Sequence, residues 1–188
     1  MRLSSLLVIL ACACATASSP PASSTPAAAP TPAAAAPEPV TPTAVTATLE
    51  SRSNSSVTGT ARVTPGGSGV IVMVDVSGAT PGEHGVHIHD KGDCSAPDAS
   101  SAGPHYNPKA SHHGGLSTPV RHTGDLGNMQ VDSNGKGLLV VAVPDLTMDQ
   151  VAGHSILVHA GKDDLQSDPA GNSGARIACG TLQAAPAQ

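Results

Sequence analysis

Short segments in which apolar and polar residues alternate recur along this chain, and clusters of glycine, proline and serine separate them. "AVTATLE" (44–50) and "VTGTARVT" (57–64) flank the turn cluster "SNSS", and "GVIVMVDVSG" (69–78) follows "PGGSG". Because side chains alternate faces along a strand, each segment predicts a strand with one buried face. Short strands joined by such turns predict an all-β domain, either a sandwich or a barrel.

The pattern continues to the end of the chain. The domain has no Phe and no Trp, and Tyr106 is its only aromatic residue, so we expect a core of Val, Ile, Leu and Ala. "LTMDQVAG" (146–153) predicts a single helical turn. Four more strands are predicted at "HGVHIHD" (84–90), "GLLVVAVP" (137–144), "SILVHA" (155–160) and "ARIACGTL" (175–182).

Two long segments, 94 to about 122 and 161–174, carry no strand pattern. Structureless segments of this length inside a compact domain are usually functional loops or disordered. The first one contains several histidines, so we expect it to be functional.

The first 17 residues have the features of an export signal. Arg2 precedes the apolar run "LLVILA" (6–11), which is too short to span a bilayer, and small residues that suit cleavage follow. "ILAC" (9–12) resembles a bacterial lipoprotein box with Cys12 as the lipidated residue, although Leu10 departs from the usual small residue. A soluble periplasmic protein and a membrane-anchored lipoprotein are both open. Either route leads to a compartment where disulfides persist.

Residues 18–43 are of low complexity, and eight of these 26 residues are proline. With almost no charge and no large apolar side chain, the segment cannot bury a core, and we expect a disordered, semi-rigid tether. The domain then occupies 44–188. Without the signal, whose only charged residue is Arg2, eight Lys and Arg face 14 Asp and Glu, a net charge of −6. No basic run exists, which argues against nucleic acid as a partner.

Three of the nine histidines lie in "GEHGVHIHDKGDC" (82–94). His87 and His89 share one face of the predicted strand, and paired imidazoles suit zinc or copper, although a polar surface strand is the alternative. Other candidate ligands follow at intervals of eight, nine and three residues, from His105 to His113, His122 and Asp125. These intervals match no compact zinc finger, so any site must combine distant segments. Six histidines and one aspartate suffice for two metals that share a ligand: His87, His89, His105, His113, His122, Asp125 and His159.

Six short motifs follow one another along the chain: "HGVHIH", "GPHYNP", "HHGG", "RHTGDLGN", "VHAGKDD" and "GNSGARIACG". Through them, residues 44–182 resemble the copper,zinc superoxide dismutases, specifically their bacterial exported branch. The resemblance implies a flattened, immunoglobulin-like Greek-key β-barrel or sandwich with both long functional loops on one side.

The resemblance also implies one copper and one zinc per chain, bridged by His105. Zinc would have the closed four-ligand site typical of structural zinc. The implied copper ligands are His87, His89, His105 and His159, and the implied zinc ligands are His105, His113, His122 and Asp125.

Three further roles follow from the same resemblance. Asp163 would link a copper histidine to a zinc histidine and fix their rings. Arg176 would lie beside the copper and receive the anionic substrate. Apart from the resemblance, Lys162 in the neighbouring loop is a weaker second candidate for a positive charge there. Cys94 and Cys179 would form the family disulfide.

Three histidines remain outside this ligand set. His84 matches a histidine that holds backbone carbonyls, so we expect a structural role. His112 is expected to be exposed, with an exchange of His112 for His113 as ligand as the alternative. His154 has no assigned role.

The implied activity is dismutation of superoxide to oxygen and hydrogen peroxide, as antioxidant defence outside the cytoplasm, with His105 also carrying a proton. The rival hypotheses are a copper storage or delivery protein of the same fold without turnover, and a purely structural tethered domain. Loss of a copper ligand or of Arg176 would favour storage, and all of them are present. Monomer and homodimer are both open.

Overall fold

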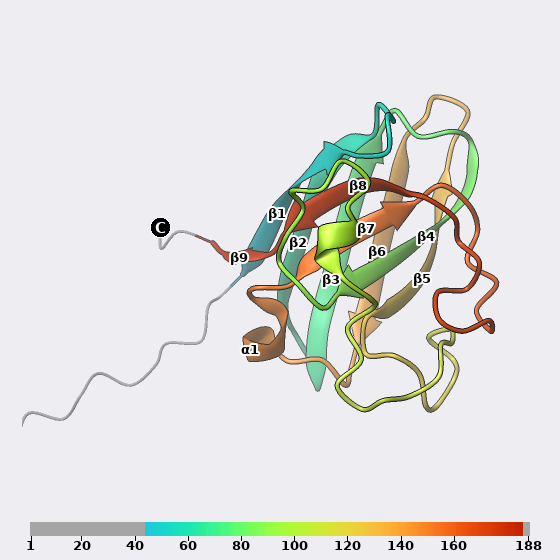
Figure 1. Cartoon of the computed structure of the whole chain (residues 1–188). Coiled ribbons are helices and arrows are strands. Elements are labelled where there is room, and N and C mark those ends of the chain that lie inside the picture. Colours follow the sequence, from blue (N-terminus) through green and yellow to red (C-terminus); the bar gives the residue numbers. More distant parts are fainter. Residues whose placement is uncertain (1–43, 186–188) are drawn as a thin grey trace, which may run out of the picture. The chain divides into compact units, whose positions relative to one another are not determined.

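The structure is a computed structural model that describes residues 44–185 (Figure 1). The predicted signal (1–17) with Cys12, the predicted tether (18–43) and the last three residues lie outside this part. Within residues 44–185, no helix is both long and apolar enough to cross a membrane.

The described domain is built almost entirely from strands. Its two helical elements are the short 3-10 helix η1 (Ser100–Ala102) and the single-turn α1 (Met148–Val151). The strands are β1 (Val45–Ser51), β2 (Thr58–Gly66), β3 (Gly69–Ser77), β4 (Gly82–His89), β5 (Asp125–Val131), β6 (Gly137–Val143), β7 (Ser155–His159), β8 (Arg176–Thr181) and β9 (Gln183–Ala184).

The sheet closes on itself. All pairings are antiparallel, in the order β2-β3-β6-β5-β4-β7-β8-β1, and β1 also pairs with β2. The short β9 adds to β1 beside the closed barrel. This arrangement confirms the predicted all-β fold and matches the Greek-key barrel that the resemblance implies.

Aliphatic side chains fill the barrel, as the composition predicts. On β3, Val70, Val72, Val74 and Val76 are almost fully buried, while the residues between them face outward. Two methionines join the valines, leucines and isoleucines of the core, and the ring of Tyr106 packs against it.

Two strands were not predicted, whereas the predicted helical turn is confirmed as α1. A reciprocal capping box between Thr147 and Gln150 starts that turn. Strand β5 lacks the expected alternation because loops cover its outer face, so both of its faces are largely buried. Gly127, at φ 85°, also interrupts it. Strand β9 has only two residues, too few for a periodic signal.

Candidate metal centre

Strand β4 buries both of its faces over residues 84–89. Val86 and Ile88 point into the barrel core, and His87 and His89 lie on the opposite face, where they are also fully buried. Since sheet side chains alternate, this is the expected geometry for "VHIH". The two long loops, yellow-green to yellow and orange-red in Figure 1, run along the outside of the barrel, and their contacts with β4 show that they cover this face.

Backbone hydrogen bonds fasten both loops to β4. The amide of Tyr106 donates to the carbonyl of Ile88 at 2.8 Å, and His105 forms an isolated bridge with His89. The amide of Gly85 donates to the carbonyl of Gly161 in the second loop at 2.9 Å. The loops therefore form a fixed lid over the outer face of β4.

Four imidazoles converge under this lid. One nitrogen from each of them lies within 4.8 Å of the others. Strand β4 supplies two rings, the first loop supplies one, and the end of β7 supplies the fourth. We call this group the copper cluster, after the metal that the resemblance implies for it: His87, His89, His105 and His159.

A second group of donors surrounds one carboxylate oxygen, Oδ1 of Asp125. The Nδ1 atoms of His105, His113 and His122 lie 2.9, 3.1 and 3.3 Å from it. A tetrahedral zinc with bonds of about 2.0–2.1 Å has donor atoms about 3.3 Å apart, so these separations fit such a site. We call these four residues the zinc cluster, and His105 belongs to both clusters.

The hydrogen bonding of the copper cluster leaves one nitrogen of each ring without a partner. Nδ1 of His87 and Nε2 of His89, His105 and His159 are buried and make no hydrogen bond. The other nitrogens are engaged: in His89, Nδ1 lies 2.8 Å from the Gly103 carbonyl, and in His159, Nδ1 lies 3.2 Å from the Gly174 carbonyl. Ligating histidines have this pattern, with one nitrogen held and the other free for metal. The residues therefore fit copper in one cluster and zinc in the other.

Burial also keeps the copper-cluster rings neutral. Desolvation, reinforced by neighbouring imidazoles, holds the pKa of His89 and His159 well below the ordinary value. Desolvation likewise lowers the pKa of His105 to about 4. Since the neutral imidazole is the form that binds a metal, the site is prepared for ligation.

The buried carboxylate of Asp163 connects the two clusters. Its Oδ2 lies 2.8 Å from Nε2 of His87, and its Oδ1 lies 2.8 Å from Nε2 of His113. Asn128 on β5 holds the backbone of Asp163 by two bonds of 2.8 Å. In the structure, Asp163 thus joins the two clusters. Asn128, whose only sequence signal was its place in the motif "GDLGN", holds it there.

Asp168 is a second residue that sequence reasoning missed. Its Oδ1 accepts the backbone amide of His113 at 2.7 Å, and its Oδ2 lies 2.5 Å from Nδ1 of His112. The side chain of His112 is 91 % exposed, as predicted, and it lies outside both clusters, while His113 lies in the zinc cluster. Asp168 therefore steadies a candidate zinc ligand from the second loop.

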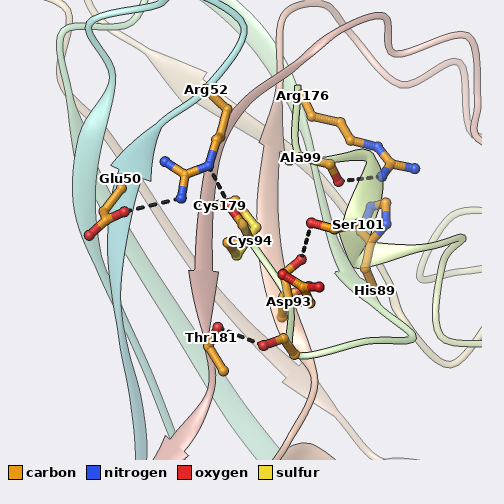
Figure 2. Close-up of a disulfide and its surroundings, with 12 residues drawn as sticks. Glu50, Arg52, His89, Asp93, Cys94, Ala99, Ser101, Arg176, Cys179 and Thr181 are labelled. Atoms are coloured by element: carbon orange, nitrogen blue, oxygen red, sulfur yellow. Dashed lines mark hydrogen bonds and ion pairs between the residues drawn. A yellow bond between two sulfur atoms is a disulfide. The ribbon is translucent and has the colours of Figure 1, made fainter. Parts of the chain in front are cut away.

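Arg176 and the copper-cluster residue His89 contact the same backbone carbonyl. Its guanidinium donates to the carbonyls of Ala99 and Gly103, each at 2.7 Å, and the Gly103 carbonyl is also the partner of His89. Figure 2 shows the guanidinium beside the His89 ring. Lys162, the second candidate charge, instead pairs with Glu83 at 2.6 Å, so its charge is balanced on the surface.

The predicted disulfide is confirmed. Cys94 and Cys179 are bonded, with their Cα atoms 5.8 Å apart (Figure 2). The bond fastens the segment that leads to η1 onto β8. Ala99, whose carbonyl contacts Arg176, lies in this segment, and Gly103, whose carbonyl contacts both Arg176 and His89, directly follows η1.

The two remaining histidines do not belong to either cluster. The ring nitrogens of His84 lie 2.7 Å from the carbonyl of His159 and 2.8 Å from that of Thr80, which confirms its structural role. His154 approaches the carbonyl of Asp90 at 2.8 Å and packs its ring against Tyr106.

Comparison with known proteins agrees with this geometry. Residues 57–182 match the family described as copper/zinc superoxide dismutase (SODC). A superoxide dismutase [Cu-Zn] of Deinococcus radiodurans is 43% identical over 142 residues, which are 68% of this chain and 78% of the relative. The extracellular superoxide dismutase [Cu-Zn] of Onchocerca volvulus is 38% identical over 145 residues, 70% of this chain and 72% of the relative.

A solved structure shares the fold. The crystal structure of the clock protein EA4 has a TM-score of 0.72 and 30% sequence identity, and the match covers 80% of this chain and 100% of that one. The chain belongs to the copper/zinc superoxide dismutase family. Copper and zinc are accordingly the metals that the family implies, and the two clusters offer donor groups that could hold them.

Proposed function

We infer that this protein catalyses the dismutation of superoxide, in which two superoxide ions and two protons give one oxygen and one hydrogen peroxide. The observation that carries the inference is the pair of buried clusters that share His105, in a chain of this family. Bound copper supplies the one-electron oxidation and reduction of superoxide, and zinc, which is not redox active, supplies a fixed charge.

The chain's own residues divide the remaining work. We assign the copper ligands to His87, His89, His105 and His159, and the zinc ligands to His105, His113, His122 and Asp125. His105 faces the copper cluster with its unpartnered Nε2 and contacts Asp125 of the zinc cluster with Nδ1, which supports our assignment of Nε2 as the atom that holds and releases a proton next to the substrate. Asp163 keeps the rings of His87 and His113 oriented.

Arg176 attracts the anion. Repulsion by a negative chain slows the approach of superoxide unless a local positive charge lies at the mouth of the site. Arg176→Glu should cut turnover sharply with full metal content, and its residual rate should respond differently to ionic strength, because salt screens the field. Nearly unchanged activity in a copper-loaded variant would refute this role.

Metal analysis combined with a superoxide assay on the purified domain tests the function. We expect one copper and one zinc per chain and rapid dismutation that requires copper. Full copper without turnover would instead identify the storage or delivery protein, and zinc alone would refute the copper ligands. Sedimentation of the same sample decides between monomer and homodimer.

We also propose that the chain is exported, as a member of the bacterial exported branch. Support comes from the apolar leader and the proline-rich segment, and the relative from Onchocerca volvulus is named as extracellular. Mass spectrometry of the mature N-terminus separates the two routes: a diacylglycerol-modified Cys12 means a membrane-anchored lipoprotein, and a start at Thr16 or Ser18 means a soluble periplasmic protein. An intact Met1 would contradict both.

A further inference from the structure

The turn between β1 and β2 forms hydrogen bonds with residues 94–103, the segment that begins at the disulfide-bonded Cys94. Nε of Arg52 donates to the carbonyl of Cys94 at 2.8 Å, and the amide of Ser53 donates to the carbonyl of Pro97 at 2.8 Å. In Figure 2, Arg52 approaches Cys94 from the side of the disulfide that is opposite to Arg176. Two consecutive turn residues therefore fix the start of the segment whose later carbonyls bind Arg176.

The same turn also grips β8, the strand that carries Arg176. The hydroxyl of Ser53 donates to the carbonyl of Arg176 at 3.0 Å, and the amide of Arg52 donates to the carbonyl of Ile177 at 2.9 Å. The turn thus contacts Arg176 at its backbone and, through residues 94–103, at its guanidinium. None of these turn residues belongs to either metal cluster.

The conformation of the turn supports a specific role. Ser53 and Asn54 both adopt the left-handed region, with φ of 52° and 58°. Asparagine adopts this region readily, but for Ser53 it costs roughly 1–2 kcal/mol and persists where the surroundings enforce it. The side chain of Arg52 is only 15% exposed, and its outer nitrogen pairs at 3.0 Å with Glu50, which is 69% exposed. Arg52 is therefore committed to local bonds rather than to attracting an anion.

We propose that Arg52, assisted by Ser53, is a positioning residue for Arg176. By holding the carbonyls of Cys94 and Pro97, the turn sets where the carbonyls of Ala99 and Gly103 lie, and these orient the guanidinium toward the copper cluster. This inference deepens the proposed function, since it assumes that an anion meets Arg176 beside copper.

The test uses the copper- and zinc-loaded protein with azide as the anionic probe. The variants are Arg52→Gln and Arg52→Lys, and Arg62→Gln, which removes an exposed arginine of β2, is the matched control. Azide affinity is read from the copper absorption, together with kcat, KM, metal content and free thiols. Lysine keeps the positive charge but lacks the forked donor geometry of arginine, so it separates charge from position.

We expect both Arg52 variants to weaken azide binding about three- to tenfold, the range that results if the net free energy of one hydrogen bond is lost from the orientation of Arg176. Turnover should fall in parallel, with full metal content and an intact disulfide, while Arg62→Gln matches the wild type. Unchanged azide affinity in the Arg52 variants, even with a lower thermal midpoint, would overturn the proposal because the role would then be structural only. Full recovery by Arg52→Lys would overturn it in favour of a charge effect.

Ser53→Ala provides an independent variant if the Arg52 variants do not fold. It removes the bond to the Arg176 carbonyl and should weaken azide binding about twofold in the same direction. Failure of the proposed function gives a different result: a wild-type protein without dismutation, in which the Arg52 variants still weaken azide binding. A wild type that dismutates, with variants that bind azide equally well, refutes positioning alone.

Discussion

The two faces of β4 are equally buried but are stabilised in opposite ways. Val86 and Ile88 enter an aliphatic core, where burial needs no directional partner. His87 and His89, on the other face, are covered by loops and held by individual bonds to Asp163 and Gly103. One strand thus joins a core to a polar site.

The difference shows what each face requires. An aliphatic core tolerates changes that preserve volume, because its stabilisation is roughly proportional to buried area. A buried imidazole nitrogen without a partner is costly, and the copper cluster has four of them. We conclude that the barrel is stable through burial, and that the loop-covered face depends on its metals and on the disulfide.

Removal of the bond between Cys94 and Cys179 has the largest predicted effect on the free energy of unfolding. Cys94 and Cys179 are 85 positions apart, and closing a loop of that length stabilises the fold by about 4–5 kcal/mol in the chain-entropy account. The double Cys→Ser variant should lose about this much free energy of unfolding in urea titration of the metal-free protein. An unchanged unfolding midpoint would show that the bond adds nothing to the barrel.

Neighbouring substitutions on β4 compare its two faces directly. Ile88→Ala should cost about 2–5 kcal/mol through lost burial and a residual cavity, while copper and zinc binding persist. His89→Ala should lose copper and activity but destabilise the metal-free barrel less, because it also removes an unpartnered nitrogen. Urea unfolding and elemental analysis measure both quantities. Equal destabilisation by the two variants, or copper retained in His89→Ala, would contradict the proposed difference between the two faces of β4.

Two glycines of the loop 161–174, Gly171 and Gly174, allow the contact with Asp163 to be tested separately from backbone strain. A Cβ at Gly171 would lie 1.8 Å from Oδ1 of Asp163, whereas a Cβ at Gly174 meets nothing closer than 3.9 Å. Both glycines have positive φ, so both alanine variants carry similar backbone strain. The same Cβ at Gly171 would lie 2.7 Å from Nε2 of His113, so it would push apart the bond between Asp163 and His113. Gly171→Ala should therefore weaken metal affinity about 10- to 100-fold, while Gly174→Ala should not. Similar metal affinities in competition titrations of both variants would refute the linking role of Asp163.

The alternating strands of the barrel were predictable from the sequence because their outer faces meet water. Strand β5 was not, since loops bury its outer side and erase the period of two. The position of these loops depends on backbone bonds such as that from Tyr106 to Ile88, which no residue pattern encodes. The fold class therefore followed from local periodicity, and the lid required the structure.

The candidate ligands were predictable for a different reason. Their motifs resemble those of a family, whereas their spacing alone left open which residues meet. Contacts between distant loop residues escaped this route: Asp168 supports His113 from 55 positions away, and Glu83 neutralises Lys162 from 79 positions away. Such pairs form only when the barrel brings their segments together.

Hydrogen exchange of the metal-free and the metal-loaded protein tests whether the metals stabilise the loop-covered face of β4. If metals stabilise the outer face of β4 and burial stabilises the inner one, metal removal should abolish dismutation and expose amides in 94–122 and 161–174. The amides of β2, β3 and β6 should stay protected, and adding copper and zinc should restore both loops and activity. Loops that stay equally protected without metal, or loss of protection throughout the barrel, would contradict the account.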